Sequence, residues 1–309
     1  MAMKFNRREA LKLMGYAGTT AVVAPSLYAF KTPNTIMKRA IPSSGATIPV
    51  VGLGTWQTFD VGSDTAMHTQ LLEVLNTMQS LGGTMIDSSP MYGNSEQVVG
   101  TLTQQTAHAN HFFYATKVWT HGKASGIAQM EASFKKMQRN SMNLMQIHNL
   151  MDWQTHIKTL RDWKAAGKIK YFGFTHYTND AHDTLAKLIK QEQPDFVQFN
   201  YAINDRNAEK RLLNVAQDQG TAVIINRPYN GGSLFRKVRG HAVPAWCADM
   251  DIQSWGQYFL KYIISHPAVT CVIPGTSKAK HVKDNMGAGY GRLPSMKERA
   301  QMLSFLQSL

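Results

Sequence analysis

The chain has 309 residues, a formal net charge of +13 and two cysteines, and 43% of its residues are hydrophobic. This apolar fraction excludes wholesale disorder, and two cysteines are too few for a disulfide framework or a Cys-based structural zinc site. No apolar run reaches the ~20 residues of a transmembrane helix, which excludes a polytopic membrane protein. The positive charge leaves open nucleic acid, an anionic membrane surface, an anionic cofactor, or solubility alone.

The N-terminus combines basic residues with a weakly hydrophobic stretch at 13–27. The basic residues are Lys4, Arg7, Arg8 and Lys12. The run Asn6–Lys12 resembles a twin-arginine export motif, and Leu27-Tyr28-Ala29 offers a cleavage site. We therefore interpret residues 1–30 as a signal segment that meets the twin-arginine translocase, leaving a folded periplasmic protein with no stable membrane span after processing. The alternatives are an amphipathic helix that is retained, and a cytoplasmic protein if the signal is non-functional.

From residue 36 onward, short β-rich runs alternate with helical patterns. A hairpin is predicted from Met37–Ile41, a Pro-Ser-Ser-Gly turn and Thr47–Ile48. Eight strands are predicted at Val50–Leu53, Thr84–Ile86, Phe112–Thr116, Leu144–Ile147, Tyr171–Phe174, Phe196–Phe199, Ala222–Ile225 and Val269–Ile273. Amphipathic helices are predicted between them, among them Thr65–Leu81, Ile127–Arg139, Trp153–Ala165, Ala181–Gln191 and Glu209–Gln219.

Eight strand-and-helix units over ~270 residues favour a (β/α)8 barrel over an open doubly wound sheet. A Rossmann sheet needs a Gly-x-Gly-x-x-Gly turn after its first strand, and the run Gly52–Trp56 lacks the third glycine. We therefore expect one α/β domain over residues 36–309, a TIM barrel with an N-terminal β-hairpin.

In such barrels the active site lies at the carboxyl ends of the strands. Three consecutive strands bring Asp87, Lys117 and His148 there, and Tyr92 follows Asp87 in its loop. An ammonium group favours a nearby phenolate and lowers its pKa, while a carboxylate keeps the ammonium charged and placed. The imidazole can orient a carbonyl oxygen beside the phenol. This set suits proton delivery to a developing alkoxide, and a cofactor must then supply the hydride.

The same stretches resemble the aldo-keto reductase superfamily. The signature of the second strand is Ile86–Gly93, with Ser95-Glu96 and Val99-Gly100 behind it. Further matching segments are Gly52–Trp56, Ala115–Trp119, Gln146–His148, Gly167–Ile169, Gly173–Thr175, Val197–Tyr201, and Val272–Gly275 through Asp284-Asn285. The resemblance runs in order from about residue 36 to residue 290, and it includes the hairpin that floors the barrel in this family.

The resemblance implies a catalytic tetrad of Asp87, Tyr92, Lys117 and His148. Tyr92 is then the general acid in NAD(P)H-dependent reduction of an aldehyde or ketone to an alcohol, or in the reverse reaction. His148 also contacts the substrate, and Trp56 and Trp119 match positions that line the substrate pocket. Such aromatic side chains favour apolar or aromatic carbonyl compounds.

The cofactor contacts that the resemblance implies are spread over several strand ends. They are Gly54, Thr55, Trp56, Thr175, His176, Gln198, Arg227, Pro228, Gly275, Thr276, Ser277, His281 and Asn285. Asn226 departs from the family, since many members place an aromatic residue there to stack on the nicotinamide. Either Tyr229 replaces that ring or polar contacts alone hold the nicotinamide. Lys278 and Lys280 could supply the positive charge for NADP(H), which we slightly prefer over NAD(H).

Three other functions compete with the enzyme. A nicotinamide-binding sensor or partner subunit with little turnover is the alternative that Asn226 and the export signal leave open. A metal hydrolase fits worse, because His108 and His111 flank the amino end of the third strand, so we expect no metal. We also expect no nucleic-acid partner, because the lysines are scattered and no aromatic stacking face is evident.

Overall fold

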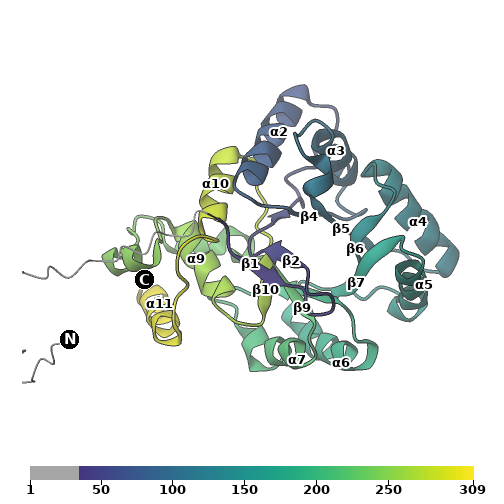
Figure 1. Cartoon of the computed structure of the whole chain (residues 1–309). Helices are drawn as coiled ribbons and strands as arrows, with labels where there is room; N and C mark the ends of the chain where they lie inside the picture. The colour runs from purple at the N-terminus through teal and green to yellow at the C-terminus, as the bar shows by residue number, and fades with distance from the viewer. Residues whose placement is uncertain (1–34) are drawn as a thin grey trace, which may run out of the picture. The chain divides into compact units, whose positions relative to one another are not determined.

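The computed structural model describes residues 35–309, so the predicted signal segment lies outside the described residues. Strands β1 (Lys38–Ala40) and β2 (Thr47–Pro49) form an antiparallel hairpin, as the sequence predicts (Figure 1). The Arg39 guanidinium donates to the carbonyls of Ile264 (2.6 Å) and His266 (3.0 Å), which fastens the hairpin to the segment before the last strand.

Eight parallel strands follow in one sheet, ordered by sequence. They are β3 (Leu53–Gly54), β4 (Met85–Asp87), β5 (Phe113–Val118), β6 (Met142–His148), β7 (Ile169–Thr175), β8 (Phe196–Asn200), β9 (Ala222–Asn226) and β10 (Val269–Val272). Parallel bridges from Val51 to Val272 and from Gly54 to Gly275 join the first and last strands. The (β/α)8 barrel with an N-terminal hairpin is therefore confirmed.

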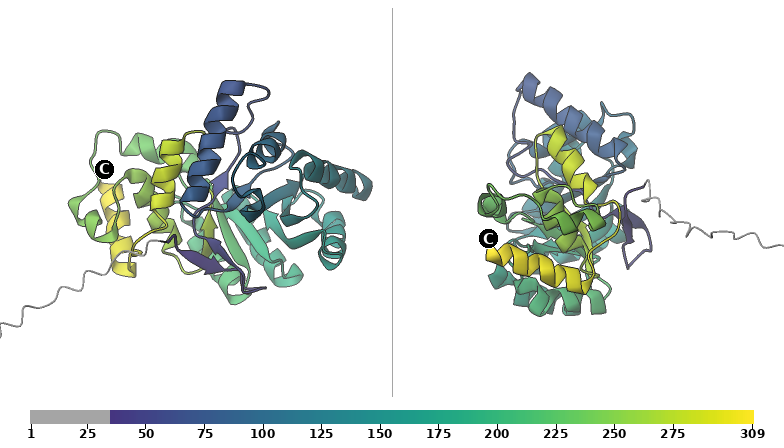
Figure 2. Two further views of the ribbon diagram at one scale, coloured as in Figure 1. Left: turned by 45° about the horizontal axis from the view of Figure 1, so that its top comes forward. Right: turned by 90° about the vertical axis from the view of Figure 1, so that its left-hand side faces the viewer.

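The strands are surrounded by helices (Figures 1 and 2). These are α2 (Thr65–Ser80), α3 (Ser95–Thr103), α4 (Lys123–Lys136), α5 (Trp153–Ala165), α6 (His182–Glu192), α7 (Leu212–Asp218), α8 (Ser233–Lys237), α9 (Trp255–Ile264), α10 (Ala279–Gly287) and α11 (Met296–Ser308). The helix predicted at Trp153–Ala165 has the predicted bounds. The one predicted from Glu209 begins instead at Leu212, because Asn207–Lys210 form a separate 3-10 turn.

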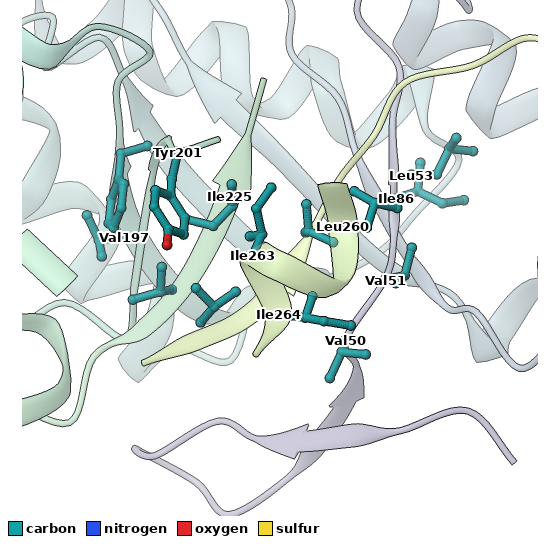
Figure 3. Packing of buried hydrophobic residues seen from close by; sticks show 14 of the residues in the cluster. Val50, Val51, Leu53, Ile86, Val197, Tyr201, Ile225, Leu260, Ile263 and Ile264 are labelled. Carbon is teal, nitrogen blue, oxygen red and sulfur yellow. The ribbon is translucent and has the colours of Figure 1, made fainter. Parts of the chain in front are cut away.

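Side chains alternate between two hydrophobic clusters along the strands. One cluster lies between strands and helices, and it contains Ile86 and Ile225 together with Ile263 of α9 (Figure 3). The other takes the alternate residues at the amino ends of the strands, which face the barrel interior. Ile41 and Ile48 of the hairpin belong to this second cluster. The hairpin therefore closes the amino end of the barrel. A binding site inside the barrel can open only at the opposite, carboxyl end of the strands.

Residues 35–309 contain neither a membrane-spanning helix nor a cluster of metal ligands. In that range no helix is both long and apolar enough to cross a membrane. The same residues contain no group of three or more His, Cys, Asp or Glu side chains arranged to hold a metal ion. Cys247 and Cys271 are both buried and free.

Candidate active site

The centre of the site is a buried ion pair between adjacent strand ends. Lys117 of β5 donates from Nζ to Asp87 Oδ2 of β4 at 2.6 Å, and both side chains are almost fully buried. Lys117 also donates to the Ser88 carbonyl at 2.6 Å. The other oxygen, Asp87 Oδ1, accepts from Gln146 at 3.0 Å and from Gln198 at 2.9 Å. These bonds hold the lysine ammonium in one place at the ends of β4 and β5.

Tyr92 lies in the loop after β4 and faces this ion pair. The ammonium of Lys117 is 4.9 Å from the centroid of the Tyr92 ring. Burial raises the pKa of Tyr92, and the positive charge of Lys117 offsets only part of that effect while Asp87 adds to it. The net shift is therefore upward, against the lowering expected from Lys117 alone. Burial also disfavours the Lys117 ammonium, but Asp87 and Tyr92 outweigh it, and the pKa of Lys117 is raised.

The loop that carries Tyr92 is held by a carboxylate from the loop after β3. Asp60 accepts from the backbone N–H of Asn94 at 2.8 Å and from its side-chain amide at 3.1 Å. Gly93 has φ of +59°, and a Cβ at this position would lie 2.3 Å from Asp60 Oδ2. Glycine is therefore required beside Tyr92 for the loop to close on Asp60.

His148 ends β6 beside Tyr92, with 5.8 Å between the ring centroids in an edge-on arrangement. Its Nδ1 lies 2.9 Å from Ser89 Oγ. Burial, together with the charge of Lys117 and the neighbouring His176, lowers the pKa of His148 to about 2. The imidazole is therefore neutral at physiological pH and has a single N–H to offer.

Two tryptophans lie on loops at the same end of the barrel. Trp119 follows β5, and its ring centroid is 6.4 Å from that of His148. Gln129 fixes its backbone by accepting from the Trp119 N–H at 2.6 Å and donating to its carbonyl at 3.1 Å. Trp56 follows β3 and is 51% exposed. Trp119 is thus placed beside His148, whereas Trp56 offers an apolar surface to solvent.

An amide network joins the predicted nicotinamide contacts to Asp87. Gln198, which donates to Asp87, accepts from Thr175 Oγ1 at 3.0 Å and from Asn226 Nδ2 at 3.3 Å. Asn226 also donates to the His176 carbonyl at 2.9 Å. Asn226 Oδ1 is buried and has no hydrogen-bond partner among residues 35–309. The ends of β7, β8 and β9 are therefore joined by hydrogen bonds. Within residues 35–309 this network leaves one buried acceptor, Asn226 Oδ1, without a donor.

Tyr229, the candidate replacement for the missing aromatic side chain, packs among other aromatic residues. Its ring packs against Phe235, with centroids 4.7 Å apart, and against Phe259 at 6.3 Å. Its hydroxyl donates to Asn285 Oδ1 at 2.6 Å. The ring and the hydroxyl of Tyr229 are therefore both engaged by residues of the chain itself.

The predicted phosphate-binding segment follows β10. Gly275 is exposed, whereas Thr276 is buried, with its hydroxyl 3.3 Å from His281 Nδ1. The backbone N–H of Lys278 donates to the same hydroxyl at 3.1 Å, and the carbonyl of Ser277 accepts from Gln70 at 2.6 Å. These bonds shape the turn that leads into α10.

The remaining predicted contacts come from the loops after β3 and β9. A Cβ on Gly54 would lie 2.8 Å from the Ile273 carbonyl, so glycine is needed where the barrel closes. Thr55 is buried and donates to the Asp87 carbonyl at 3.0 Å. Arg227 has a positive φ of 50°, and its guanidinium lies 5.8 Å from the ring centroid of Tyr177. Pro228 follows it and is buried.

Two residues of the site received no role from sequence reasoning. Gln146 lies two residues before His148 on the same strand, so both side chains face the same side, and this spacing was a usable signal. Ser89 lies between Asp87 and Tyr92, and nothing in the local pattern indicates its contact with a histidine 59 residues away.

The chain matches one protein family over most of its length. The profile of the Aldo/keto reductase family matches residues 50–300. Methylglyoxal reductase YeaE of Escherichia coli (strain K12) is 28% identical over 250 residues, covering 79% of this chain and 86% of the relative. L-glyceraldehyde 3-phosphate reductase of the same strain is 23% identical, covering 84% of this chain and 89% of the relative. The chain belongs to the aldo/keto reductase family.

Solved structures show the same fold. The thermostable aldo-keto reductase Tm1743, solved with the inhibitor epalrestat, has a TM-score of 0.72 at 22% identity, covering 88% of this chain and 100% of the other. An aldo/keto reductase from Klebsiella pneumoniae in complex with NADP and acetate has a TM-score of 0.70 at 24% identity, covering 85% and 93%. The protein is an oxidoreductase of the aldo-keto reductase type, whose activity is NAD(P)H-dependent carbonyl reduction.

Proposed function

We propose that the protein reduces small aldehydes or ketones to alcohols with Tyr92 as the general acid. The observation that carries the proposal is the convergence of the Asp87–Lys117 ion pair, the Tyr92 ring and the neutral His148 at one end of the barrel. Methylglyoxal, the substrate in the name of one relative, is the first compound to assay. Aromatic aldehydes are the second, because of Trp56 and Trp119.

The described residues fit a nicotinamide cofactor. Asn226 Oδ1 is a buried acceptor without a partner, and it lies in the amide network with Thr175 and Gln198. We assign these three residues to the carboxamide, and Thr276 and Ser277 to the phosphates. When bound, the reduced cofactor supplies the hydride. Lys278 and Lys280 are exposed beside the phosphate segment and favour NADPH over NADH.

The chain's own residues supply the remainder of the reaction. The raised pKa of Tyr92 keeps its phenol protonated, which suits transfer of its proton to the carbonyl oxygen as that oxygen gains negative charge. Lys117 then stabilises the phenolate, and Asp87 keeps Lys117 in place. His148 orients the carbonyl by hydrogen bonding to its oxygen.

The test follows absorbance near 340 nm with NADPH and then NADH, in the presence of methylglyoxal or aromatic aldehydes. We expect Tyr92→Phe to lower kcat/KM by about 10³-fold, because it removes the acidic proton and little volume. Tyr171→Phe, a matched change at a phenol that bonds Ser44 of the hairpin turn at the opposite end of the barrel, should retain activity. Tight cofactor binding without turnover of any carbonyl would support the nicotinamide sensor instead.

We further propose that the protein is exported in its folded state to the periplasm by the twin-arginine translocase. The proposal rests on Asn6–Lys12 and the weakly hydrophobic stretch behind it. The double substitution of Arg7→Lys and Arg8→Lys should retain the protein in the cytoplasm, measured by fractionation. Unchanged export of this variant would show that Arg7 and Arg8 are not the export signal and would overturn the proposal.

A further inference from the structure

Ser89 contacts the imidazole of His148 from the loop that carries Tyr92. Its side chain is fully buried, and its Oγ lies 2.9 Å from His148 Nδ1. The loop turns tightly here, since the Tyr92 N–H donates to the Ser89 carbonyl at 3.0 Å. One residue thus links the two side chains that are expected to face the carbonyl oxygen.

The direction of the Ser89–His148 hydrogen bond follows from the protons available. The Met91 N–H donates to Ser89 Oγ at 3.3 Å, so the oxygen already accepts one bond. A serine hydroxyl has a single proton to donate. Among residues 35–309, His148 Nδ1 is the one atom within hydrogen-bond distance of Ser89 Oγ that can accept this proton. If Nδ1 carried a proton instead, the Ser89 proton would be buried without a partner, which is unfavourable.

The proton of a neutral imidazole then belongs on the other nitrogen. His148 is buried and neutral, so it has one N–H, and a bond accepted at Nδ1 leaves that N–H at Nε2. An Nε2–H can donate to a carbonyl oxygen, whereas an unprotonated Nε2 would repel it.

We propose that Ser89 is a positioning residue, which fixes His148 as the Nε2–H tautomer and thereby makes it a hydrogen-bond donor to the substrate carbonyl. The proposal rests on the proposed reductase function but concerns a proton position that exists without turnover. Ser89 acts through His148 and needs no contact with the substrate.

The first test measures the tautomer directly in the full-length protein labelled with ¹⁵N-histidine. Long-range ¹H–¹⁵N correlation spectra distinguish a protonated Nε2 from a protonated Nδ1, and His148→Gln assigns the signal. We expect the proton on Nε2 in the wild type and a mixture of tautomers in Ser89→Ala. A wild-type proton on Nδ1, or an unchanged tautomer in Ser89→Ala, overturns the proposal even if no carbonyl substrate is found.

The second test measures turnover. Ser89→Ala should lower kcat/KM by about tenfold, the value of one hydrogen bond of ordinary strength, and Ser89→Thr should restore most of it. Ser133→Ala removes another buried serine hydroxyl, which donates to the Gln129 carbonyl at 3.2 Å and also lies beside Glu96, and it serves as the control for a general packing effect. Equal activity in Ser89→Ala and Ser133→Ala would contradict a positioning role. The spectrum of the wild type decides the question if Ser89→Ala does not fold.

Discussion

At the scale of single residues, the site depends on charged side chains that are almost fully buried. Lys117 is fully buried, and its cost of burial is offset by Asp87 at 2.6 Å and by the Ser88 carbonyl. The same burial raises the pKa of Tyr92, which Lys117 counters only in part. The raised pKa keeps the Tyr92 phenol protonated at physiological pH, as proton transfer to a carbonyl oxygen requires.

The neutral state of His148 predicts a pH dependence of stability. Its pKa is lowered from 6.5 to about 2 on folding, so between these values the unfolded chain binds a proton that the folded imidazole does not. Stability is therefore present above about pH 6.5 and is lost as the pH falls, at up to about 1.4 kcal/mol per pH unit. From about pH 7 to about pH 5, the wild type should lose about 2 kcal/mol more than His148→Gln.

Urea unfolding at the two pH values measures this difference. Other buried histidines contribute equally to both proteins and cancel in the comparison. Identical losses in wild type and His148→Gln would mean that His148 is protonated in the folded state, and its role as a neutral donor would then fail.

At the scale of elements, α11 shows how a distant partner shapes a local boundary. Arg299 of α11 donates to Glu209 Oε1 and to the Tyr201 hydroxyl, each at 2.9 Å. Glu209 lies in the 3-10 turn Asn207–Lys210, and for this reason the helix expected from Glu209 starts only at Leu212. The local apolar periodicity predicted a helix from Glu209. It carries no information about the bond between Glu209 and Arg299, which is 90 residues away in the chain.

The start of α11 carries a capping box that can be tested. Ser295 Oγ accepts from the Glu298 N–H at 3.3 Å, and Glu298 accepts from the Ser295 N–H at 2.7 Å. We expect Ser295→Ala to lower the free energy of unfolding by about 1 kcal/mol, since the first turn loses an acceptor. Ser308→Ala, at the exposed end of the same helix, should change it by less than about 0.5 kcal/mol. Equal effects in urea unfolding would show that the cap contributes nothing to stability.

At the scale of the whole molecule, the barrel and the meeting of Asp87, Lys117 and His148 at one end of it were predictable, because both follow from the positions of strand ends. Asp87, Lys117 and His148 each end or adjoin a strand, and parallel strands bring such positions to one face. The bond between Ser89 and His148 and the unpaired oxygen of Asn226 were not predictable, since each depends on side chains from loops or strands far apart in the chain.

Cofactor binding should stabilise the whole barrel, because the proposed contacts come from β7, β8, β9 and the segment after β10. At a ligand concentration of about 100 times Kd, binding to the folded state alone adds about 2.7 kcal/mol to the free energy of unfolding. We expect NADPH to raise Tm at lower concentration than NADH, given Lys278 and Lys280 beside the phosphate segment.

Asn226→Ala tests which part of the cofactor is responsible for this stabilisation. It removes the acceptor assigned to the carboxamide, so the concentration of NADPH needed for a given rise in Tm should increase about tenfold, the value of one hydrogen bond. The response to adenosine 2′,5′-bisphosphate, which has no nicotinamide, should stay unchanged. If both ligands lose affinity equally, Asn226 supports the fold of the site and not the nicotinamide, since only a carboxamide contact distinguishes the two compounds.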